Sequence, residues 1–60
     1  MSLKEEVLKL FEEVLTLRGE KKIKETVERY SKVIEGISIQ ELLYEKSTLA
    51  KEIERLEQNG

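Results

Sequence analysis

The sequence predicts an all-α protein of three short amphipathic helices, at about residues 3–18, 21–35 and 39–57. Composition is the first observation behind this prediction, because all 13 acidic residues are Glu and the chain has no Pro, His, Cys or Trp. Glu, Lys and Leu favour helix interiors, whereas Asp competes with the helix through local hydrogen bonds. Apolar residues at helical spacing and two capping signals are the other observations, and 60 residues allow one domain, 1–60.

The first predicted helix begins after Ser2, because Ser2 and Glu5 have the spacing of a capping box. Apolar residues then recur mainly three and four positions apart, and they cover about half of the helix surface. This face comprises Leu3, Val7, Leu8, Leu10, Phe11, Val14, Leu15 and Leu17. A face this wide usually packs against two neighbours. Gly19 is predicted to end the helix as its C′ residue.

The second predicted helix has its own apolar stripe, formed by Ile23, Val27, Tyr30, Val33, Ile34 and Ile37. A single long helix through Gly19 is the alternative, since one helical glycine costs only about 1 kcal/mol. Continued at 100° per residue, however, the second stripe would lie roughly 130° away from the first. A hairpin at residues 18–20 brings the two stripes together, and it is the prediction we prefer.

The third predicted helix has the clearest start. Gly36 occupies the C′ position of the preceding helix, Ser38 is an N-cap, and Glu41 completes a capping box. Ile37 and Leu42 have the spacing of a hydrophobic staple. The apolar stripe that follows includes one charged residue and is formed by Leu42, Lys46, Leu49, Ile53 and Leu56.

We expect this stripe to be an interface, because a lone 60-residue chain is marginally stable. Burial contributes roughly 90 kcal/mol, and ordering the chain costs roughly the same. The sequence therefore predicts self-association into a homodimer or higher oligomer, or binding to a larger protein, with the third helix as the main contact. The three helices form either a compact bundle or a helical hairpin whose third helix pairs between chains. Lys46 leaves two hypotheses open: its stem packs while its amine reaches water, or it fixes the register of an intermolecular coiled coil.

The residue inventory argues against enzyme chemistry. Nucleophilic triads need a base such as His, and zinc or iron sites need Cys or His, so no catalytic, cofactor-binding or metal site is predicted. The three glycines are isolated and form no phosphate-binding loop. The longest apolar run is three residues, at 42–44, so we expect neither a membrane span nor a signal peptide, and a cytoplasmic location.

Two polar clusters could contact a partner. One is a possible partner face on the third helix, formed by Tyr44, Thr48, Lys51 and Arg55. The other is basic and surrounds the first turn, at Arg18, Lys21, Lys22 and Lys24. Solvent-exposed surface is the commoner interpretation of both clusters.

The second and third helices with their short turn have the outline of a DNA-binding helix-turn-helix. The pattern departs at Lys32, where a small residue is needed, and at Glu35, where an apolar one is usual. Glu41 and Glu45 on the would-be recognition helix repel phosphates, and the net charge is −2. We therefore expect no specific nucleic acid partner and no small-molecule substrate.

Residues 19–30 also resemble part of the small subunit of exonuclease VII, a short helical accessory subunit. The similarity rests on Gly19, Glu20, Ile23, Glu25, Val27, Glu28 and Tyr30. Val33 lies where that family tends to have glycine, and the segment before Gly19 is shorter. The resemblance implies a second function, support of a larger nucleic-acid enzyme. A designed helical scaffold without a biological role is a third interpretation that the composition leaves open.

Overall fold

The computed structural model describes residues 2–59, which form three helices and no strands: α1 (Leu3–Leu17), α2 (Ile23–Ile34) and α3 (Ile39–Asn59). The predicted fold class is confirmed. Ser2 caps α1, where its hydroxyl oxygen accepts a hydrogen bond from the Glu5 backbone N–H at 3.2 Å. Ser38 does the same for α3 through the Glu41 N–H, also at 3.2 Å. Both predicted caps are therefore present.

The turn after α1 is a Schellman motif built on Gly19. Gly19 has a φ of 76°, the left-handed conformation that glycine adopts without steric cost. Its N–H donates to the Thr16 carbonyl, and the Glu20 N–H donates to the Leu15 carbonyl, both at 3.0 Å. These bonds end the helix and reverse the chain, as the hairpin prediction requires.

Two boundaries lie two residues from their approximate predicted positions. The second helix begins at Ile23 and not at residue 21, because Lys22 is outside the helix and has no side-chain acceptor that could cap it. Lysines at a helix N-terminus also oppose the helix dipole. The third helix continues to Asn59 and not to residue 57, since no glycine or proline interrupts it before Gly60, which lies outside the described residues.

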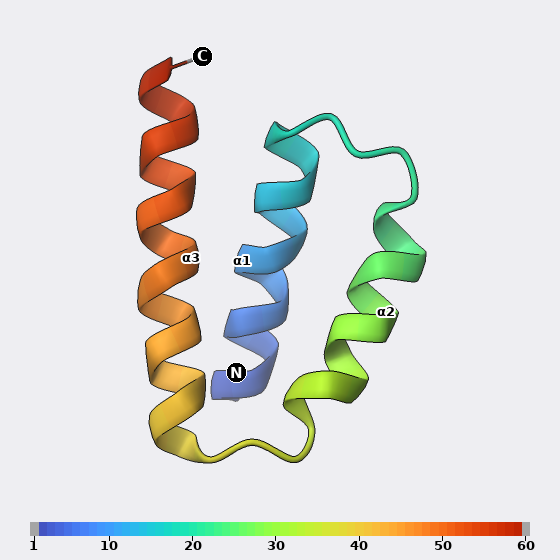
Figure 1. Ribbon diagram of the computed structural model, residues 1–60, viewed down its shortest axis with the longest axis vertical. Helices are drawn as coiled ribbons and strands as arrows, with labels where there is room; N and C mark the ends of the chain where they lie inside the picture. Colours follow the sequence, from blue (N-terminus) through green and yellow to red (C-terminus); the bar gives the residue numbers. More distant parts are fainter. Residues whose placement is uncertain (1, 60) are drawn as a thin grey trace.

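In Figure 1, α1 lies between the other two helices and runs in the same direction as α3, while α2 runs the opposite way. α1 packs most extensively on α3 and less on α2, and α2 and α3 contact each other least. The expectation that the broad face of the first helix meets two neighbours is confirmed. The buried side chains are Val7, Val14, Leu15, Ile34 and Ile53, three of them on α1.

The molecule is flattened, with extents of 33 × 23 × 17 Å, and Figure 1 looks along the shortest of these. The pair formed by α1 and α3 therefore has two long sides. We call the side on which α2 lies the covered side, and the opposite side the open side. Among residues 2–59, none of the helices has both the length and the hydropathy that a membrane span requires.

Candidate interaction surface

The α3 stripe predicted as an interface lies against α1 of the same chain. Ile53 is buried and the other four members are half-buried: Leu42, Lys46, Leu49 and Leu56. Most of the apolar surface of this stripe is therefore packed within one chain. Contact with a second chain stays a prediction, and it would involve the parts of the stripe that are still exposed.

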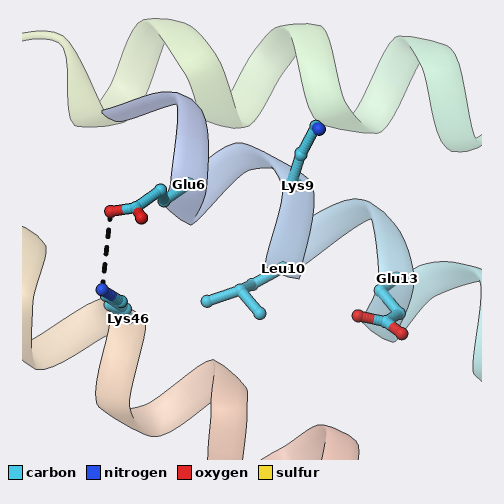
Figure 2. Close-up of a pocket in the computed structure, with 5 residues that line it drawn as sticks. All are labelled: Glu6, Lys9, Leu10, Glu13 and Lys46. Carbon is cyan, nitrogen blue, oxygen red and sulfur yellow. Dashed lines mark hydrogen bonds and ion pairs between the residues drawn. The ribbon is translucent and has the colours of Figure 1, made fainter. Parts of the chain in front are cut away.

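Lys46 crosses from α3 to α1 at the edge of the stripe. Its Nζ atom donates to the Glu6 carboxylate at 3.4 Å, and the two side chains are 43% and 42% exposed (Figure 2). The stem lies beside apolar neighbours while the amine reaches a carboxylate at the surface, which is the snorkelling arrangement. A pair this exposed contributes between about 0 and 1 kcal/mol to stability.

The Lys46–Glu6 pair borders a shallow hollow of about 320 Å³ between α1 and α3. Its lining comes from these two helices alone: Glu6, Lys9, Leu10 and Glu13 of α1, and Lys46 of α3. Figure 2 shows Leu10 pointing into the space between α1 and α3 and Glu13 beside it, while Lys9 points from α1 away from α3. The hollow lies on the open side, because Leu10 is on the flank of α1 away from Phe11, whose ring stacks on Tyr30 of α2.

Exposed apolar side chains extend the open side beyond the hollow. Leu43 precedes Lys46 by three positions and Ile39 precedes Leu43 by four, so these residues share one strip of α3. Leu43 is 51% and Ile39 69% exposed. On α1, Leu17 follows Glu13 by four positions and is 43% exposed. The open side is thus an apolar surface with charged side chains at its centre.

The covered side is packed with aromatic and polar groups. The rings of Phe11 on α1 and Tyr30 on α2 stack with their centroids 4.0 Å apart. Burial raises the pKa of the Tyr30 hydroxyl, and charge repulsion and a hydrogen bond from the nearby Glu45 carboxylate add to this effect, so that the pKa is about 12. Tyr30 therefore stays neutral near pH 7 and joins α2 to both other helices.

The Glu52 carboxylate binds two arginine side chains on the covered side. It accepts hydrogen bonds from the Arg18 guanidinium at 2.6 Å and from Arg55 at 2.7 Å. The Glu52 side chain is only 19% exposed. The hydrogen bonds from Arg18 and then from Arg55 lower the pKa of this carboxyl below its ordinary value. The carboxylate thus links the end of α1 to the middle of α3.

The two polar clusters noted in the sequence lie on exposed surface. All four residues of the possible partner face are exposed, and Tyr44 is 72% exposed. Arg55 of that face is held by Glu52, and so is Arg18 of the basic cluster. The lysines of the basic cluster, Lys21, Lys22 and Lys24, are exposed around the α1–α2 turn. Neither cluster lines the hollow between α1 and α3.

The sequence analysis missed Glu6, Lys9 and Glu13, because it assigned the interface to α3 alone. A signal was present in the first helix. Its apolar face covers about half of the helix surface, and Leu10 and Leu17 lie at the edge of that face. Among residues 2–59, no three Cys, His, Asp or Glu side chains gather in a way that could hold a metal ion.

Comparison of the chain with protein-family models, characterised proteins and solved structures found no match. The resemblance of residues 19–30 to the small subunit of exonuclease VII thus stays a similarity of one short segment. The functional argument therefore depends on the surfaces described above.

Proposed function

We propose that this protein is a non-catalytic self-association module, which forms a homodimer or a higher oligomer by burying apolar helix surface. The single observation that carries the proposal is the distribution of apolar side chains among residues 2–59. The buried core consists of five residues, and an equal number of large apolar side chains are exposed: Leu17, Val33, Ile39, Leu43 and Tyr44. Contact with a second chain would remove part of that surface from water.

The accessible surface supports the same proposal. It measures 4717 Å², whereas a compact monomer of 7.0 kDa has about 4000 Å² by the scaling of folded monomers. The excess of about 700 Å² is close to the roughly 800 Å² that each partner buries in a standard interface. A chain that leaves this much surface exposed gains stability when it associates, because a bound partner stabilises the folded state by mass action.

The test is a measurement of mass against concentration. Sedimentation equilibrium and light scattering should give the mass of a dimer or larger species at micromolar concentration. The thermal midpoint, followed by circular dichroism, should rise with protein concentration. A mass of one chain at every concentration, with a constant thermal midpoint, would overturn the proposal.

A further inference from the structure

We infer that the open side of the α1–α3 pair is the surface on which a second copy of this chain docks, in an antiparallel arrangement related by a two-fold axis. This inference rests on the proposed function and adds the location and the partner. Its geometrical basis is the hollow between α1 and α3, which α2 leaves uncovered (Figure 2). Leu10 points into this hollow, and exposed Leu43 lies on the adjoining strip of α3.

The charges of the hollow favour a second copy over a partner of one charge sign. Its lining holds two positive side chains, Lys9 and Lys46, and two negative ones, Glu6 and Glu13. In an isologous dimer the same patch meets itself, so residue i contacts j and j contacts i. A patch that carries both signs can satisfy this condition, whereas a patch of one sign repels its copy.

Lys9 and Glu13 have the spacing that an antiparallel pair needs. They lie one helical turn apart on α1, and both are exposed. A two-fold axis that is perpendicular to α1 and lies in the open-side interface, level with the turn between Lys9 and Glu13, brings Lys9 of one copy opposite Glu13 of the other, and the reverse. Under the same axis, Leu10 lies close to its own counterpart in the second copy.

The accessible surface of the chain is also large enough to supply a dimer interface. The accessible surface exceeds the compact-monomer value by about 700 Å², and a standard interface buries about 800 Å² on each partner. Two α1–α3 layers stacked face to face would form a four-helix arrangement, with charged pairs near the two-fold axis and exposed apolar side chains around them.

The test uses charge exchange. Lys9→Glu and Glu13→Lys each place like charges opposite each other twice in the dimer, so each should raise the dimer Kd about tenfold at low salt. The two variants mixed in equal amounts should restore dimers, because every Glu then meets a Lys, and this recovery should weaken at high salt. Native mass spectrometry would identify the mixed dimer.

An apolar substitution supplies the matched control. Leu43→Glu on the open side should raise the dimer Kd by at least about a hundredfold, since a carboxylate would be buried without a partner in each copy. Val33→Glu introduces the same charge at a more exposed site on α2, 65% against 51%, and should leave the dimer Kd within about threefold. Circular dichroism of both variants would check that the helices are retained.

The outcomes separate this inference from the proposed function. A protein that is monomeric at all concentrations overturns both. A dimer that tolerates Leu43→Glu and gains nothing from the mixed charge variants overturns the open-side interface alone. A dimer that is lost with Val33→Glu but kept with Leu43→Glu does the same, because it moves the interface to α2.

Discussion

The two sides of the α1–α3 pair differ in how their polar groups are satisfied. On the covered side, Glu52 is bound by two guanidinium groups, and Tyr30 stacks on Phe11. On the open side, the ion pair that joins the two helices within residues 2–59 is Lys46–Glu6 at 3.4 Å, and both of its side chains are more than two-fifths exposed. On the covered side the polar groups are paired within the chain, while the open side keeps apolar side chains exposed to water.

This comparison shows what a third helix adds to a helical pair. α2 is the shortest helix and packs mainly on α1, yet its position determines which side of the α1–α3 pair is shielded from solvent. Half-buried carboxylates are tolerated on the covered side because cations and an aromatic ring surround them there. Apolar side chains on the other flank have no such neighbours within the chain, and they remain in contact with water.

The largest expected effect on stability comes from shortening Ile34, the buried side chain of α2. Ile34 is 2% exposed, so Ile34→Ala should lower the free energy of unfolding by about 2–5 kcal/mol. Val33→Ala, at the neighbouring but 65% exposed position, should change it by less than about 0.5 kcal/mol. Urea denaturation followed by circular dichroism would measure both.

Ile34→Val provides a milder step if the alanine variant does not fold. It should cost about 0.5–1.5 kcal/mol. Equal losses for Ile34→Val and Val33→Ala would contradict the assignment of α2 as a helix anchored through Ile34.

Substitution in the turn between α1 and α2 should have an intermediate effect on the free energy of unfolding. Gly19→Ala should cost about 1 kcal/mol, because its φ of 76° is unfavourable for any residue with a Cβ atom. Gly36 has no positive φ and no atom within 4 Å of an added Cβ, so Gly36→Ala should be neutral or slightly stabilising. Thermal unfolding of the two variants side by side would test the difference, and a more harmful Gly36→Ala would refute it.

The smallest expected effect on stability comes from the Glu52 carboxylate, and it appears mainly at low pH. The pKa of Glu52 is lower in the folded protein than its ordinary 4.5, so its contribution is present above pH 4.5 and is lost as the pH falls below it. Glu52→Gln should therefore flatten the acid side of the stability curve. Thermal midpoints measured between pH 2 and pH 7 would show this, and identical curves for Glu52→Gln and the parent would speak against it.

The sequence predicted the fold well because its signals are local. A serine three positions before a glutamate and a glycine after an apolar stripe act within one helical turn, and Ser2, Ser38 and Gly19 have the expected hydrogen bonds or φ. The start of α2 was harder to place, because Lys22 precedes it without any capping side chain.

The candidate surface was only partly predictable. The stripe around Leu49 was predicted as an interface with a second chain, and it packs on α1 of the same chain. Periodicity does not tell whether the neighbour of an apolar stripe belongs to the same chain. The open side depends on which flank of the pair α2 covers, and that is decided by packing in three dimensions. Lys9 and Glu13 look like ordinary solvent-exposed charges until α1 is placed beside α3.

The central position of α1 also bears on how the chain is made. α1 leaves the ribosome before the other two helices, yet its most extensive neighbour, α3, is synthesised last. Until α3 emerges, the nascent chain holds only the smaller α1–α2 contact, and the α3-facing part of α1 stays uncovered. Folding should therefore wait for the last third of the chain and then proceed in one cooperative step that joins its first and last helices. Any product of interrupted synthesis would present a bare apolar helix face to chaperones and proteases.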